Sequence, residues 1–139
     1  MIIDDNEFSR VLISVKLKKH GFHNLTIPDT SIDAWNDIAN GHLSDKPFDL
    51  VITDLNMPGL DGMDLISKIK DDPLSEDLDI IVISADADQT IIKITKTLGA
   101  CAYLVKPFIT AELLAVVEAV LKGEEIPAVK GMFPQKSSL

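Results

Sequence analysis

Short runs of β-branched and other apolar residues alternate with longer amphipathic stretches along the chain, and this alternation constrains the fold more than any other feature. The apolar runs predict five strands, at residues 1–3, 24–27, 48–53, 80–84 and 102–105. Apolar residues at helical spacing follow each run, and these stretches end near Gly21, Gly41, Lys70, Leu98 and Gly123. Strands that are each followed by a helix form a parallel sheet covered on both faces, because the crossovers are right-handed. We therefore expect an α/β fold with a single five-stranded parallel sheet.

The 139 residues are enough for one domain, and a composition of 46% hydrophobic and 25% charged residues is typical of a soluble globular chain. The periodic pattern ends at Gly123, so we expect residues 1–122 to form the domain and residues 123–139 to form a flexible tail or the start of a linker. Three residues are few for a buried first strand. We expect either residues upstream of Met1 or a trimmed edge.

Charge and cysteine content exclude several classes of protein. The 13 Lys and Arg residues against 22 Asp and Glu give a net charge of -9, which disfavours direct binding of nucleic acid. Cys101 is the single cysteine, so no intramolecular disulfide is possible and a reducing cytoplasm fits. The apolar runs are far shorter than the roughly 20 residues that cross a bilayer, and acidic residues follow the first run where a signal peptide would be apolar. We expect a cytoplasmic protein that does not enter membranes.

Polar residues follow four of the five predicted strands. Asp4 and Asp5 follow the first, Asp54 the third, Ser84 the fourth and Lys106 the fifth. In an open parallel sheet, ligands bind outside the carboxyl ends of the strands, so these side chains are expected to converge if the strands are neighbours. Three carboxylates at one place repel one another, and a hard divalent cation with oxygen ligands relieves the repulsion. The sequence therefore predicts a Mg²⁺ site.

A metal, a lysine and a hydroxyl around one carboxylate are typical of phosphoryl transfer, where charge develops on the transferring oxygens. Asp54 is the expected nucleophile, which would form an acyl phosphate. Lys106 and Ser84 would each hold a phosphoryl oxygen, and the small side chain of Ala85 would leave room for the group. The sequence contains no Walker loop, zinc-protease motif or GxGxxG run after the first strand.

These residues resemble the receiver domain of two-component response regulators, of the kind found in chemotaxis regulators, over Met1 to about Lys122. Four segments carry the resemblance: Asp4-Asp5, the run Asp-Leu-Asn-Met-Pro-Gly-Leu-Asp-Gly at 54–62, Ser84-Ala85, and the run Gly-Ala-Cys-Ala-Tyr-Leu-Val-Lys-Pro-Phe at 99–108. The resemblance implies a flavodoxin-like (βα)5 fold with strand order 2-1-3-4-5. It also implies that Asp54 accepts a phosphoryl group from a histidine kinase or a histidine phosphotransfer protein.

The resemblance further implies roles for individual residues. Asp5 and Asp54 would bind Mg²⁺ directly, Asn56 through its backbone carbonyl, and Asp4 through water. Ser84 and Tyr103 match the switch positions of the family, and the Lys106-Pro107 peptide bond would be cis. Such a protein modifies itself and loses the phosphoryl group by autodephosphorylation, but turns over no external substrate.

Two further expectations concern regulation. Asn56 and Asp86 lie two residues after Asp54 and Ser84, where they would flank an attacking water and tune dephosphorylation. Ile91, Ile92 and Ile94 cannot all point inward at helical spacing. We therefore expect an exposed apolar residue there, and a contact surface for an effector or a second copy formed by the fourth helix, fifth strand and fifth helix.

Three other functions fit the sequence less well. A magnesium phosphohydrolase of the haloacid dehalogenase kind needs a second acid two residues after the nucleophile, where this chain has Asn56. A flavin-binding electron carrier needs a phosphate loop after the first strand, where residues 4–7 are mostly acidic and would repel phosphate. A degenerate receiver that serves only as a docking scaffold is disfavoured because no acidic, hydroxyl or lysine position is missing.

Overall fold

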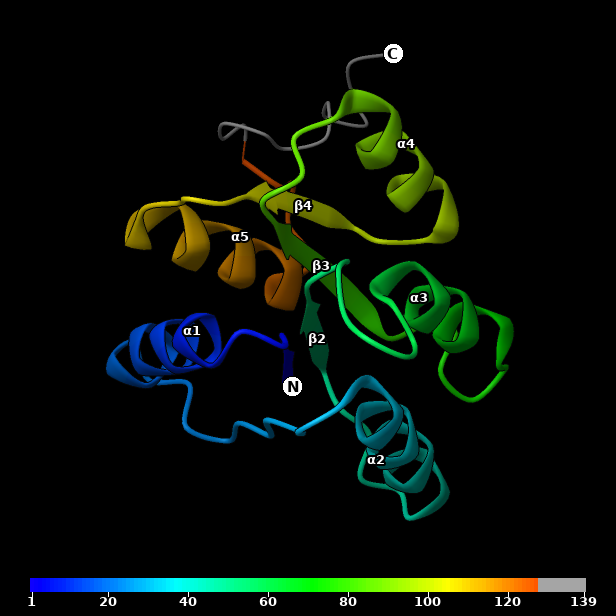
Figure 1. Ribbon diagram of the computed structural model, residues 1–139. Helices are drawn as coiled ribbons and strands as arrows, with labels where there is room; N and C mark the ends of the chain where they lie inside the picture. The colour runs from blue at the N-terminus through cyan, green and yellow to red at the C-terminus, as the bar shows by residue number, and fades with distance from the viewer. Residues whose placement is uncertain (128–139) are drawn as a thin grey trace.

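A computed structural model describes residues 1–127, in which one parallel sheet lies between two layers of helices (Figure 1). The strands are β1 (Ile2–Ile3), β2 (Leu50–Thr53), β3 (Asp79–Ser84) and β4 (Ala102–Val105), in the order β1-β2-β3-β4. The helices are α1 (Glu7–Lys19), α2 (Ser31–Leu43), α3 (Gly62–Asp71), α4 (Gln89–Leu98) and α5 (Thr110–Lys122). All neighbouring strands are parallel, which confirms the α/β, flavodoxin-like class.

The described residues form four strands, so the prediction of a fifth strand at residues 24–27 is wrong for this structure. The segment does lie beside β1, because the Ile2 N–H donates to the Thr26 carbonyl at 2.9 Å. In a parallel ladder, Ile2 would then accept a bond from residue 28. That residue is Pro28, which has no N–H. The strand order therefore matches the expected 2-1-3-4-5 without its first member.

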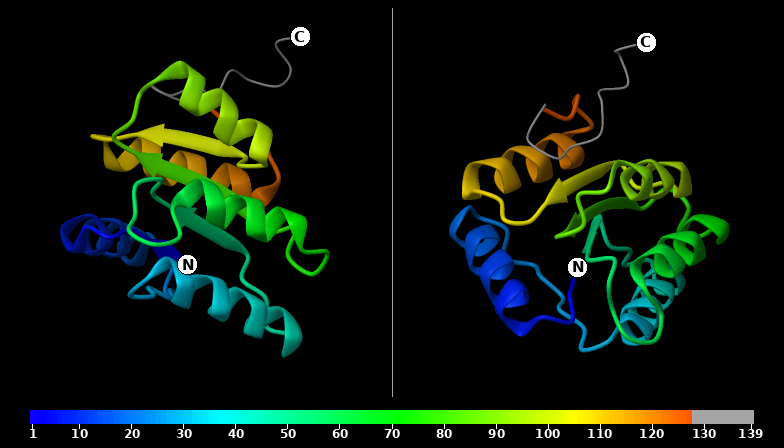
Figure 2. Two further views of the ribbon diagram at one scale, coloured as in Figure 1. Left: turned by 45° about the vertical axis from the view of Figure 1, so that its right-hand side comes forward. Right: turned by 45° about the horizontal axis from the view of Figure 1, so that its top comes forward.

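The two faces of the sheet bury different side chains, as the period of two along each strand requires. Val51, Ile80 and Val82 pack with residues of α2, α3 and α4. Ile52, Ile81 and Ile83 pack with residues of α1 and α5 on the other face. Figure 2 shows these two helix layers on opposite sides of the sheet. The position of β3, buried on both faces, agrees with the long apolar run that predicts it.

Side-chain caps begin the first four helices. The caps are Asn6, Thr30, Asp61 and Asp88, each of which accepts a hydrogen bond from a backbone N–H in the first turn. Such caps satisfy N–H groups that have no partner within the helix. Asn6 and Asp88 therefore begin α1 and α4 only a few residues after the ends of β1 and β3.

Helix α1 forms where the spacing of Phe8, Val11 and Val15 predicts it, but these side chains are exposed by 74%, 53% and 41%. Ile13 and Leu17 pack on the sheet in their place. The apolar spacing thus identifies the helix without identifying its buried face.

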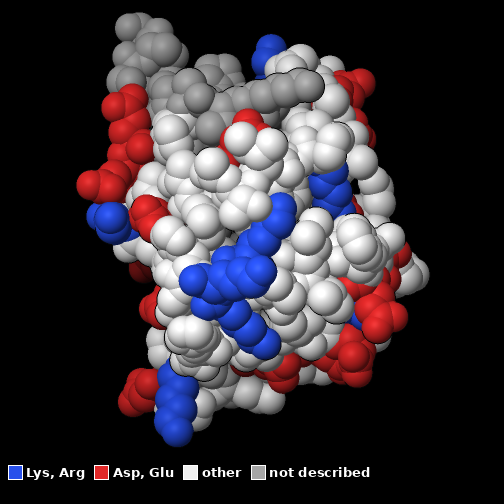
Figure 3. Space-filling view, turned by 90° about the vertical axis from the view of Figure 1, so that its left-hand side faces the viewer, with Lys and Arg blue, Asp and Glu red and all other residues white. Residues whose placement is uncertain are grey.

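Figure 3 shows Lys and Arg side chains gathered in a band across the face that α1 and α5 share, although the net charge of the chain is -9.

Helix α5 ends at Lys122, where Gly123 adopts a φ of 67°. Most of the tail expected at residues 123–139 lies outside the described residues, because the description stops at residue 127. Within residues 1–127, none of the helices has the length and apolar character needed to cross a membrane.

Candidate functional site

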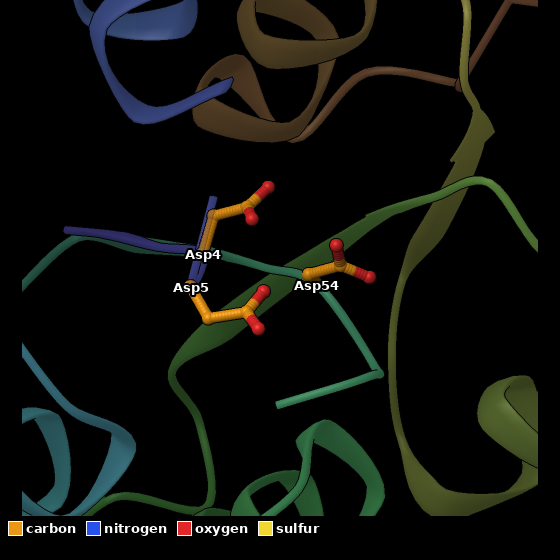
Figure 4. A group of neighbouring side chains, drawn as sticks. All are labelled: Asp4, Asp5 and Asp54. Atoms are coloured by element: carbon orange, nitrogen blue, oxygen red, sulfur yellow. The ribbon is translucent and has the colours of Figure 1, made fainter. Parts of the chain in front are cut away.

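Three aspartates lie together at the carboxyl ends of two neighbouring strands. Asp4 and Asp5 follow β1, and Asp54 follows β2. One carboxylate oxygen from each lies within 4.8 Å of the others (Figure 4). Asp4 is buried, Asp54 is half-buried and Asp5 is exposed. The parallel pairing of Ile3 with Thr53 places these residues side by side.

Lys106 from the end of β4 bridges two of these carboxylates. Its Nζ donates to Asp4 Oδ2 at 2.7 Å and to Asp54 Oδ2 at 3.0 Å. Burial by itself would lower the pKa of Lys106, but the hydrogen bonds to Asp4 and Asp54 outweigh this effect and the pKa is raised. Lys106 therefore stays charged, and its ammonium pairs with two of the three carboxylates.

Backbone amides hold the other carboxylate oxygens. Asp54 Oδ1 accepts hydrogen bonds from the N–H groups of Leu55 at 2.6 Å and Asn56 at 3.4 Å. An oxygen of Asp4, Oδ1, accepts from the N–H of Asn6 at 2.9 Å. Bonds on both oxygens restrict the rotation of each carboxylate. Asp4 and Asp54 are thereby oriented with Oδ2 toward Lys106.

The loop from β2 to α3 packs closely against Asp54, and Gly62 makes this possible. A Cβ atom at residue 62 would lie 2.2 Å from the Asp54 carbonyl oxygen and 2.7 Å from the Leu55 Cα. The Gly62 N–H also donates to the Leu55 carbonyl at 2.8 Å. Backbone atoms this close leave no space for a side chain. Gly62, the last residue of the run at 54–62, is therefore needed for the path of the loop.

Ser84 and Tyr103 meet the same turn after β3. Both side chains are fully buried. Ser84 Oγ accepts from the Asp86 N–H at 3.2 Å, and the Tyr103 hydroxyl donates to the Asp86 carbonyl at 2.6 Å. Burial raises the pKa of Tyr103, opposed by a hydrogen bond to Ser84, so the phenol stays neutral. Tyr103 thus occupies an inward position.

The remaining predicted residues lie in the turns that follow β2 and β3. Asn56 and Ala85 are exposed, and Asp86 is half-buried with Oδ1 accepting from the Asp88 N–H at 3.0 Å. The Lys106-Pro107 bond is cis, as the resemblance implies.

Two residues of α1 that sequence reasoning missed also touch the site. Ser9 Oγ lies 3.3 Å from Lys106 Nζ, and Arg10 Nη1 donates to the Asp4 carbonyl at 2.7 Å. No motif marks them, because their contacts depend on how the first turn of α1 lies beside Asp4.

Comparisons of sequence agree on one family. Residues 1–118 match the response regulator receiver domain. A probable chemotaxis protein CheY of Rhizobium etli is 31% identical over 122 residues, which cover 86% of this chain and 89% of that protein. Chemotaxis protein CheY-3 of Vibrio cholerae is 34% identical over 113 residues, which cover 81% of this chain and 83% of that protein.

Solved structures agree with this result. A putative response regulator from Chloroflexus aurantiacus superposes with a TM-score of 0.77 at 27% identity, covering 87% of this chain and 94% of that one. A chain of the CheX-CheY-BeF3-Mg²⁺ complex from Borrelia burgdorferi gives a TM-score of 0.77 at 26% identity, with coverage of 86% and 85%.

The chain belongs to the response regulator receiver domain family. It is a CheY-like receiver of two-component signalling, a family in which a phosphoacceptor role is typical and turnover of an external substrate is not. This membership decides against the phosphohydrolase and flavin-carrier alternatives.

Proposed function

We propose that Asp54 is the phosphoacceptor of this receiver domain and that a histidine kinase or a histidine phosphotransfer protein supplies the phosphoryl group. The observation that carries the proposal is the half-buried Asp54 carboxylate, held by backbone amides beside Lys106 and two further aspartates. In the transfer, an Asp54 oxygen attacks phosphorus while the P–N bond to the donor imidazole breaks. The imidazole takes up a proton, and the product is an acyl phosphate on Asp54.

The acidic cluster fits Mg²⁺, because its donors are oxygens and one ammonium leaves the three carboxylates under-neutralised. Asp5 and Asp54 would hold the ion directly, Asn56 would bind it through its backbone carbonyl, and Asp4 would bind it through water. When bound, Mg²⁺ offsets the charge of these carboxylates and of the phosphoryl group. The Mg²⁺ in the complex that contains the Borrelia burgdorferi protein supports the choice of this metal.

Other residues would contact the oxygens of the phosphoryl group on Asp54. Lys106 already contacts Asp54 Oδ2 and would donate to a phosphoryl oxygen. Ser84 would turn its hydroxyl to a second oxygen, while the small side chain of Ala85 leaves room beside it. The domain would then lose the group by autodephosphorylation and turn over no external substrate.

Acetyl phosphate with Mg²⁺ is expected to add one phosphoryl group to the protein, since a small donor needs only the site residues. Intact-mass spectrometry measures the product. Asp54→Asn should gain no phosphoryl mass, whereas the exposed and distant Asp77→Asn should gain as much as the unmodified protein. An Asp54→Asn protein that gains the same mass would refute the assignment.

Removal of the Lys106 ammonium is expected to strengthen Mg²⁺ binding. Its hydrogen bonds compete with the metal for Asp4 and Asp54. Lys106→Met should therefore bind Mg²⁺ about tenfold more tightly, and Asp5→Asn about tenfold more weakly, each a change of about 1.4 kcal/mol. Isothermal calorimetry measures both, with the exposed Lys18→Met as control. If Lys106→Met bound Mg²⁺ no more tightly, the metal would not share these carboxylates.

Asn56 and Asp86 are expected to set the lifetime of the acyl phosphate, because they follow Asp54 and Ser84 by two residues, where they would flank an attacking water. The double variant Asn56→Met with Asp86→Ala should change the dephosphorylation half-life by at least about threefold. The reason is that the rate of hydrolysis depends on how well the attacking water is positioned. Decay of the phosphorylated mass measures the half-life. If the half-life of the double variant equalled that of the Asp77→Asn control, residues other than Asn56 and Asp86 would control the access of water to Asp54.

Phosphorylation is proposed to reach the surface through Ser84 and Tyr103. If Ser84 turns to a phosphoryl oxygen, its bonds to the turn at Asp86 change, and Tyr103 is bonded to the same turn. Asp88, two residues on, caps α4. The position of Tyr103 is then a two-state element that the phosphoryl group biases. On α4, Ile92 is buried and Ile94 is 43% exposed, so an apolar residue is available to an effector or a second copy.

Beryllofluoride, a mimic of the phosphoryl group, is expected to shift amide resonances across α4, β4 and α5, including that of Ile94. The fifth strand predicted from the sequence corresponds to β4 of the structure. Self-association or effector affinity should rise in parallel, measured by sedimentation or calorimetry. Asp54→Asn with beryllofluoride is the control. Shifts confined to the aspartates and Lys106, with no change in association, would rule out this surface.

A further inference from the structure

The first residue of helix α2 carries a buried hydroxyl that no other described residue binds. Ser31 is 4% exposed, and among residues 1–127 its Oγ has no hydrogen-bond partner. The neighbouring hydroxyl, Thr30 Oγ1, serves as the helix cap by accepting from the Asp33 N–H at 3.0 Å. A buried polar group without a partner is costly, so native structures nearly always satisfy it through protein or water. Ser31 therefore needs a partner from outside the polypeptide.

Ser31 lines a small cavity together with two aspartates of the site. The cavity has a volume of about 60 Å³, and the loops before α1, α2 and α3 contribute to its wall. Asp4 and Asp5 come from the first of these loops, Asp29 from the second and Met57 from the third. A water molecule takes up about 30 Å³ in the liquid, so this space is enough for about two waters. The carboxylate and hydroxyl groups of the wall are the polar partners that ordered water requires.

The charges at the wall favour water over a second cation as the occupant of this cavity. Helix α2 begins at Ser31, and the first turn of a helix carries partial positive charge that repels a cation. Water is neutral, and it both donates and accepts hydrogen bonds. A hydroxyl likewise donates one hydrogen bond and accepts others. Water in the cavity can therefore bind the Ser31 hydroxyl and a carboxylate at the same time.

Asp5 belongs both to this cavity and to the acidic cluster. It lines the cavity, and one of its carboxylate oxygens lies within 4.8 Å of oxygens of Asp4 and Asp54. Mg²⁺ keeps several of its waters when it binds to a protein. The hydrogens of such a water are free to donate, and groups that bind metal ligands from outside orient them and tune the affinity for the metal. A hydroxyl that shares a cavity with Asp5 is in the right place for this role.

We propose that Ser31 is a positioning residue for Mg²⁺. Its hydroxyl accepts a hydrogen bond from a water bound to the ion and donates to a second water in the cavity. This inference rests on the proposed function, because that function assigns Mg²⁺ to Asp5 and Asp54. It adds a contact from α2, a helix from which the proposed function takes no residue.

Variants of Ser31 with and without a hydroxyl test the proposal by isothermal calorimetry with Mg²⁺. Ser31→Ala should bind Mg²⁺ about fivefold more weakly than the unmodified protein, a smaller loss than for Asp5→Asn because the contact runs through water. Threonine and valine have nearly the same shape, and only threonine keeps the hydroxyl. Ser31→Thr should therefore bind Mg²⁺ about fivefold more tightly than Ser31→Val. Ser44→Ala, at the C-cap of the same helix, is the control and should keep the full affinity.

Thermal unfolding without Mg²⁺ separates this role from a structural one. Because the hydroxyl has no protein partner among the described residues, Ser31→Ala should unfold at a Tm no lower than that of the unmodified protein. A lower Tm would overturn the proposal, since the hydroxyl would then bind within the protein. Unchanged Mg²⁺ affinity in Ser31→Ala, or equal affinities in Ser31→Thr and Ser31→Val, would also overturn it.

Failure of the proposed function gives a different result. If the unmodified protein bound no Mg²⁺, or if Asp5→Asn bound it as tightly as the unmodified protein, the metal assignment itself would be wrong, and this inference with it. If Asp5→Asn weakened binding while Ser31→Ala did not, the metal assignment would stand and only the role of Ser31 would be refuted.

Discussion

The parallel pairing of β1 with β2, buried on both faces of the sheet, is the constraint on which the rest of the structure depends. Ile3 pairs with Thr53, so the residues that follow, Asp4 and Asp54, emerge at one edge. A slip by one residue would turn every buried side chain of the strand to the opposite face. The apolar cores on the two faces therefore fix the register, and the register fixes the distance between the carboxylates.

The site that results carries more negative charge than its own residues neutralise. Asp4 is buried and bonded to Lys106, while Asp5 remains exposed and close to the other two carboxylates. Stability of the fold is served by the Lys106 bridge, because it pairs a buried charge that would otherwise be costly. The excess charge that remains favours binding of a cation. Lys106 therefore contributes both to the stability of the fold and to the charge balance of the site.

The turn after β3 joins the interior of the site to the surface. Within three residues, Asp86 binds both Ser84 and Tyr103, and Asp88 begins α4. A hydrogen bond lost at Ser84 would therefore free a backbone N–H two residues before the cap of α4.

The sequence by itself determined the class of fold and the identity of the chemical groups, because apolar period and the residues that follow each strand are local properties. The helices, the central β3 and the presence of Asp4, Asp5, Asp54, Ser84 and Lys106 at strand ends were all predictable in this way. Only the tertiary structure decided that residues 24–27 do not form a strand, since the Ile2 N–H donates to the Thr26 carbonyl and Pro28 has no N–H to donate in return. The same holds for Ser9 and Arg10 beside the site, and for Ile13 and Leu17 as the buried face of α1 in place of Phe8. Contacts between distant segments follow from how helices pack on the sheet, and the local pattern does not encode that packing.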